Sequence, residues 1–113
     1  MDKVKIKEIE SYLKNSLGLS DEEIKNLLEL AKLNIKKHIK ELETFIFNKD
    51  FENISKTAHT LKGVVLNLGL TEIAQNLKTL ELKAKEEKNI KEITKLFETI
   101  KAALKDIFNC YNR

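Results

Sequence analysis

Three residues in the middle of the chain, His59, Lys62 and Gly63, combine groups that could carry chemistry. Their spacing of i, i+3 and i+4 places them on one surface if the segment is a helix. An imidazole nitrogen is a nucleophile near neutral pH, and an ammonium group can neutralise anionic oxygens. A glycine beside them leaves the backbone uncovered. These residue types predict a site for nucleophilic chemistry at His59.

The position of Gly63 supports this interpretation, because glycine inside a helix costs about 1 kcal/mol relative to alanine. The apolar residues of this segment recur in steps of three and four: Phe51, Ile54, Ala58, Leu61, Val65 and Leu68. At about 100° per residue, His59 lies about 130° and Gly63 about 170° from the mean direction of this seam. Both are therefore predicted to face outward. Leu66, about 110° from the seam, adds an exposed apolar side chain nearby.

Glu81 is expected to lie opposite His59 when the two predicted helices on either side of Leu70 are paired as an antiparallel hairpin. Gly69 is predicted to end the helix in a left-handed conformation, and Leu70 marks the turn to the next helix. In an antiparallel hairpin about Leu70, His59 lies eleven residues before the turn and Glu81 eleven after it. The carboxylate can accept the N–H of one ring nitrogen, which would fix the tautomer and leave the other nitrogen as the nucleophile.

Helices must position these groups, and the sequence contains the capping residues that are typical of helix N-termini. Ser20–Glu23 reads as a capping box, and Asp50 is a good N-cap. Thr71 can cap the next helix, and Asn89–Glu92 resembles a second capping box. Apolar seams at helical spacing continue through the remaining segments: Ile6, Ile9, Leu13 and Leu17; Ile24, Leu28, Ala31, Ile35, Leu42 and Phe45; Leu70, Ile73, Leu77, Leu80 and Ala84; Ile90, Ile93, Phe97, Ile100, Leu104, Ile107 and Tyr111.

These patterns predict an all-α fold, since the chain has no proline and only 3 glycines in 113 residues. Short links imply antiparallel neighbours. We expect one domain over residues 1–113: an up-down antiparallel four-helix bundle with an additional short N-terminal helix.

Composition excludes several classes of protein. One cysteine, Cys110, allows neither an internal disulfide nor a four-cysteine zinc site, and we interpret it as structural or incidental. No apolar run approaches the roughly 20 residues that span a bilayer, and residues 1–10 lack the apolar core of a signal peptide. The net charge of +3 is spread along the chain, without the basic stripe of a nucleic-acid binder. We expect a cytoplasmic protein that binds neither membrane nor nucleic acid.

Two short runs, Ala58-His59-Thr60-Leu61-Lys62-Gly63 and Asn67-Leu68-Gly69-Leu70, resemble the signature of histidine-containing phosphotransfer (HPt) domains. The resemblance is close over about residues 50–85. It implies a four-helix bundle in which His59 accepts a phosphoryl group on Nε2 and Lys62 lies near the phosphoryl oxygens. It further implies that Gly63 gives a receiver domain access and that Glu81 bonds the other ring nitrogen. Val64, Val65 and Leu66 are bulkier than the residues that many family members have there.

The implied function is that of a phosphorelay carrier, which is not a self-sufficient enzyme. Its partners would be the receiver domain of a response regulator, a hybrid sensor histidine kinase, or both. We expect no cofactor and no metal, because the receiver would supply Mg²⁺. Docking should use Leu66, with Ser55, Lys56 and Asn67 at its edge, and we expect a monomer.

Two alternatives stay open. The chain could be a helical interaction bundle that docks a partner without chemistry, with Lys62 and Glu81 as ordinary surface charges. It could instead be a module excised from a hybrid or chemotaxis sensor kinase. Because the chain begins with Met1, we expect a free-standing protein. The other histidine, His38, lies beside a helix seam and is interpreted as a rim residue without function.

Overall fold

The computed structural model describes residues 3–108, and these are helical apart from short connections. The elements in chain order are α1 (Lys3–Leu17), α2 (Asp21–Phe47), α3 (Phe51–Asn67), α4 (Thr71–Leu82), the π-helical segment η1 (Lys83–Glu87) and α5 (Ile90–Phe108). The part of the chain that the structure describes contains no strand. The prediction of an all-α fold is confirmed.

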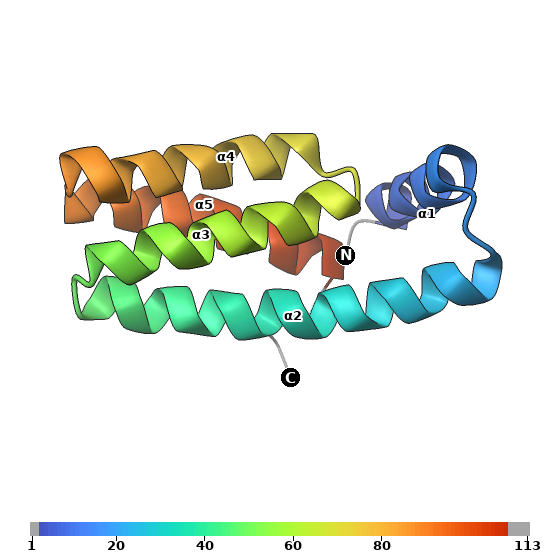
Figure 1. The fold of residues 1–113 in the computed structure, drawn as a ribbon, viewed down its shortest axis with the longest axis horizontal. Coiled ribbons are helices and arrows are strands. Elements are labelled where there is room, and N and C mark those ends of the chain that lie inside the picture. The colour runs from blue at the N-terminus through green and yellow to red at the C-terminus, as the bar shows by residue number, and fades with distance from the viewer. Residues whose placement is uncertain (1–2, 109–113) are drawn as a thin grey trace.

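Helices α2, α3, α4 and α5 run along the long axis of the molecule, whose extents are 42 × 28 × 19 Å, while α1 is inclined to it (Figure 1). Helix α3 packs against α2 on one side and α4 on the other, while α5 contacts both α2 and α4. Helix α2, with 27 residues, is much longer than the 17-residue α3. Its N-terminal part continues past the α3–α4 turn, where α1 packs against it (Figure 1).

All five α-helices contribute to one hydrophobic core. Each supplies at least one side chain that is fully buried, such as Leu13, Leu42, Leu61, Leu80 and Ile100. The predicted seam of α3 is buried from Ile54 to Leu68, and only Phe51 at its start remains partly exposed. The spacing of apolar residues therefore gave the correct inner face of the helix that carries His59.

The ends of the helices match the predicted caps with one exception. In the capping box, the Glu23 N–H donates to Ser20 Oγ at 3.2 Å and the Ser20 N–H donates to Glu23 Oε1 at 2.9 Å. Asp50 caps α3 by accepting the Asn53 N–H at 3.3 Å. Asn89 Oδ1 accepts two backbone N–H groups at the start of α5.

The exception is Thr71, which is already the first residue of α4 and does not cap it. The N-cap is Leu70, which is buried and makes no side-chain capping bond. The turn is closed by the Leu70 N–H, which donates to the Val65 carbonyl at 3.0 Å. The burial of an apolar side chain therefore decides the start of α4 rather than a polar cap.

Gly69 in this turn has the predicted left-handed backbone, with φ of +77°. A Cβ atom at this position would lie only 2.9 Å from the ring of Tyr12 in α1. Glycine is therefore needed twice, once for the backbone angle and once because α1 packs directly on the turn. This contact ties the leading helix to the hairpin that carries the site.

Candidate functional site

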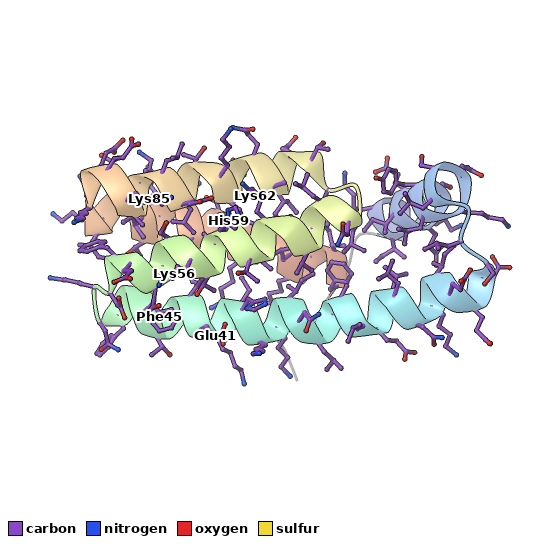
Figure 2. All side chains as sticks on the ribbon, in the orientation of Figure 1. Glu41, Phe45, Lys56, His59, Lys62 and Lys85 are labelled. Atoms are coloured by element: carbon purple, nitrogen blue, oxygen red, sulfur yellow. The ribbon has the colours of Figure 1, made fainter. Side chains whose placement is uncertain are left out.

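His59 lies in the middle of α3 and points away from the core (Figure 2). Its side chain is 64% exposed. Gly63, one turn later, is exposed, and a Cβ atom there would meet no heavy atom within 4 Å. Close packing against a neighbouring helix therefore does not explain this glycine. Leu66 is also exposed, as its angle from the seam predicted. The face around His59 thus has a bare backbone patch and an apolar side chain.

Glu81 lies beside His59, as the hairpin register predicted. The Nδ1 atom of His59 is 3.2 Å from Glu81 Oε1, across the seam between α3 and α4. The neighbours Ala58 and Leu80 are buried in the core, which fixes the two backbones at this level. The Glu81 side chain is only 12% exposed, so its carboxylate is held in the seam rather than free in solvent.

Two lysines flank the same carboxylate. Lys62 Nζ lies 3.7 Å from Glu81 Oε1, and Lys85 Nζ lies 3.6 Å from Oε2. Burial by itself raises the pKa of Glu81. The hydrogen bond with His59 and the positive charges of His59, Lys62 and Lys85 outweigh that effect and hold the pKa below its ordinary value. Glu81 is therefore ionised near neutral pH.

An ionised carboxylate sets the protonation of the neighbouring ring. Because it can only accept, Nδ1 of His59 must be the nitrogen that carries the proton. The lone pair of a neutral ring then resides on Nε2. A nucleophilic Nε2, an exposed ring and nearby ammonium groups are what nucleophilic attack on a phosphorus or carbonyl centre requires.

The four predicted docking residues occupy different environments. Leu66 and Asn67 are exposed at the C-terminal end of α3, and Lys56 is exposed and forms an ion pair with Glu52 at 3.1 Å. Ser55, in contrast, is buried, with only 4% of its surface exposed. Its expected place at the exposed edge was wrong, because it lies on the side of α3 that packs against the α4–η1 segment.

Lys85 is a residue near His59 that the sequence analysis did not single out. It lies in η1 and lines a hollow next to His59. The i, i+4 spacing of Glu81 and Lys85 was the available signal, since such pairs meet on one helical face.

The second histidine is less accessible. His38 Nδ1 lies 2.9 Å from Glu41 Oε1, and its side chain is 14% exposed. This agrees with a rim position. Residues 3–108 contain no group of three or more His, Cys, Asp or Glu residues that could hold a metal ion, and none of their helices is long and apolar enough to cross a membrane. Cys110 and Tyr111 lie outside the described residues.

Another hollow on the described part does not include His59. It is a groove of about 660 Å³ between α1 and the N-terminal half of α2, with Ile6, Ile24, Leu28 and Phe108 in its wall. None of the predicted site residues lines it. The chemistry-bearing residues therefore gather on the α3–α4 face and not in this groove.

A comparison with models of protein families shows to which family the chain belongs. The model of the Hpt domain matches residues 22–109, which include α3, α4, α5 and all of α2 after its first residue, but not α1. No curated protein and no solved structure matches. Since the match covers most of the chain and includes His59 with its surroundings, the protein belongs to the Hpt domain family.

Proposed function

We propose that this protein is a phosphorelay carrier that accepts a phosphoryl group on His59 and exchanges it with an aspartate of response-regulator receiver domains. Hpt domains act in histidine phosphotransfer in two-component phosphorelays, so the family gives the reaction class. The observation that carries the assignment to His59 is its geometry. The Nδ1 atom is bound to Glu81 at 3.2 Å, and the ring is 64% exposed.

In the forward step, the lone pair of Nε2 forms a bond to phosphorus while the bond between phosphorus and the aspartyl oxygen breaks. The leaving carboxylate keeps that electron pair. The proton on Nδ1 stays on the ring, which becomes a phosphoimidazolium whose positive charge is balanced by Glu81. The reverse step returns the phosphoryl group to an aspartate. Such transfers depend on positioning and on neutralising the charge of the equatorial oxygens.

In this proposal, Glu81 orients the ring and stabilises its protonated form, and Lys62 contributes positive charge. Lys62 is 22% exposed at its side chain and contacts Glu81, so it acts near the ring without projecting freely into solvent. The receiver contributes the Mg²⁺ and the acidic residue, and the carrier contributes no metal. The carrier is therefore a substrate of its partners more than an enzyme.

The docking surface would be centred on Gly63 and Leu66, with Lys56 and Asn67 at its edge. A bare patch on Gly63 lets a partner approach the helix backbone closely. The net charge of +3 suits an acidic pocket. Partners would be a receiver domain, a hybrid sensor kinase, or both. We further propose that residues 1–113 form one monomeric, cytoplasmic domain, with α2–α5 as an up-down antiparallel bundle.

The decisive experiment measures phosphoryl transfer. Receiver domains from the same cell are charged with acetyl phosphate and mixed with this protein, and acid-labile, base-stable label on the protein is followed. The test variant is His59→Gln, and His38→Gln is a matched control that removes the other described histidine. We expect rapid labelling of the wild type and of His38→Gln and none of His59→Gln.

The alternative is a bundle that docks its partner without chemistry. It would be favoured if a receiver binds both the wild type and His59→Gln with equal affinity and no label reaches either protein. Label that persists on His59→Gln would instead overturn the assignment of the acceptor.

A further inference from the structure

The side of α2 that faces away from the core carries two exposed leucines. Leu30 is 57% exposed and Leu33 is 66% exposed. Helix α2 packs against α1, α3 and α5 and forms the edge of the molecule that lies away from α4 (Figure 1). No helix within residues 3–108 covers the two leucines, although this side of an amphipathic helix normally carries polar residues.

The two leucines belong to a row of residues that are all exposed. The row follows steps of three, four, three, four and three residues, and we call it the outer seam of α2: Glu23, Asn26, Leu30, Leu33, Lys37 and Lys40. Such steps keep the side chains on one side of the helix over a length of about 26 Å. They are also the steps by which two helices pack side by side in a coiled coil. The outer seam therefore has the spacing of a contact surface for another helix.

The charges of the outer seam are separated along the helix. The N-terminal end carries Glu23, the middle carries the two leucines, and the C-terminal end carries Lys37 and Lys40. Within residues 3–108, neither of these lysines forms an ion pair. A helix that fits the seam must therefore place an acidic end opposite the lysines and a basic end opposite Glu23.

A second copy of α2 that runs antiparallel to the first meets this requirement. With a two-fold axis between Leu30 and Leu33, Leu30 of each copy lies level with Leu33 of the other. The same register brings complementary polar groups together on both sides of the leucines: Glu23 with Lys40, and the Asn26 amide oxygen with the Lys37 ammonium group. Each of these contacts occurs twice, because the interface is symmetric. A parallel pair would instead place like charges together.

We propose that the outer seam of α2 is the contact surface for a second copy of this chain, with the two α2 helices antiparallel about a two-fold axis between Leu30 and Leu33. This inference goes beyond the proposed function and does not depend on it. His59 contacts Glu81 on α4, whereas α2 lies on the other side of α3. The surface around His59 therefore stays open in both copies of the pair.

The pair is expected to be weak. Its only apolar layers are the two contacts between Leu30 and Leu33, whereas permanent dimers have hydrophobic interfaces that bury more than about 2,000 Å². Polar residues within a seam of this kind fix its register at a cost in stability. The monomer proposed above therefore describes the dilute protein, and pairing should be measurable between about 10 µM and about 1 mM.

Sedimentation equilibrium of the full chain at low ionic strength tests the proposal. A reducing agent prevents Cys110 from linking two copies. The mass should rise from 13.1 kDa toward twice that value as the concentration increases. The variants are Leu30→Gln and Leu33→Gln, because glutamine is a good helix former. Leu82→Gln is the matched control, since it removes another exposed leucine, on α4 and outside the seam.

Each of the two substitutions in the seam should raise the dissociation constant at least about tenfold, because symmetry removes the leucine from both apolar layers. Leu82→Gln should leave it unchanged. Melting temperatures close to that of the wild type would show that the variants are folded, as expected for exposed positions.

A charge reversal tests the antiparallel register. Lys40→Glu would place two carboxylates together and should raise the dissociation constant about threefold to tenfold at low ionic strength. Adding Glu23→Gln should reverse most of that rise, since glutamine removes the repelling charge and keeps the capping box. Phosphoramidate, a small phosphoryl donor that needs no partner protein, should label His59 equally in all these variants, because the pairing does not cover the ring.

A mass of 13.1 kDa at every concentration up to about 1 mM would overturn the pairing. Pairing that both leucine variants leave unchanged, or that Leu82→Gln weakens equally, would overturn the assignment to α2. Pairing that Lys40→Glu does not weaken would overturn the antiparallel register. The proposed function would fail separately, if neither phosphoramidate nor any receiver labels His59 of the wild type.

Discussion

The Nδ1 atom of His59 lies 3.2 Å from a carboxylate oxygen of Glu81, although the two residues are 22 positions apart and belong to different helices. In the proposed function, helix α3 therefore supplies the nucleophile, and α4 supplies the group that decides which ring nitrogen carries the proton. Any change that alters the packing of these two helices should alter the reactivity of the histidine.

Replacing Glu81 separates the role of its oxygen from the role of its charge. Glu81→Gln keeps an oxygen that can accept the Nδ1 proton, whereas Glu81→Ala removes the acceptor. Since a charge-assisted hydrogen bond is about twice as strong as a neutral one, we expect transfer from a receiver to slow about threefold in Glu81→Gln. Glu81→Ala should slow it at least about tenfold, because the ring loses its orientation. Single-turnover kinetics measures both, and equal rates in all three proteins would contradict a role for Glu81.

Acid should remove the stabilisation that Glu81 provides. The pKa of Glu81 is lower in the folded protein than in the unfolded chain, where it is about 4.3. The stabilisation of the fold by the Glu81 carboxylate is therefore complete above the unfolded pKa. It is lost as the pH falls through the lower pKa of the folded protein. We expect the free energy of unfolding to decrease more steeply below about pH 5 in the wild type than in Glu81→Gln. Denaturant titrations at several pH values measure this, and parallel curves would refute it.

Two substitutions of Gly63 should distinguish an effect on the stability of the fold from an effect on the access of a partner. Gly63→Ala adds a Cβ in open space and should raise the free energy of unfolding by about 1 kcal/mol. Gly63→Gln should also fold, but its side chain would cover the patch beside His59. We expect slower transfer from a receiver in Gly63→Gln with unchanged labelling by phosphoramidate. Slower labelling by both donors would show that the substitution damages the ring and not the docking surface.

Gly18 and Gly69 both have a left-handed backbone, so substitutions at the two positions can be compared directly. Gly18, with φ of +68°, has open space around it, while Gly69, with φ of +77°, faces Tyr12. Gly18→Ala should cost only the backbone penalty of about 1–2 kcal/mol, and Gly69→Ala should cost more. Urea denaturation measures the difference. It should disappear when Gly69→Ala is combined with Tyr12→Ala, and a difference that persists would show that the ring is not the obstacle.

The sequence predicted the features that repeat along a helix. The three- and four-residue steps from Ile54 to Leu68 gave the buried face of α3, and the same geometry placed His59 and Gly63 outside. The contact with Glu81 was predictable because the α3–α4 hairpin is tight. With so short a turn, register follows from counting residues.

Other features depend on contacts between helices and could not be read from one helix. Ser55 is buried because the α4–η1 segment covers it, although its own angle on α3 is close to that of His59. The burial of Leu70 displaced the expected cap at Thr71. The π-helical turn of η1 has no signal in the spacing of apolar residues. The place of Lys85 could have been inferred only from its i, i+4 spacing to Glu81.

The tight turn from α3 to α4 also bears on how the protein folds. The hairpin brings His59 and Glu81 together by closing a loop of only 22 residues, and the entropy of closure grows with loop length. The pair of His59 and Glu81 thus belongs to a unit of low contact order, which is typical of rapid folding. The long α2 and the leading α1 can dock onto this unit later without changing which atoms face each other.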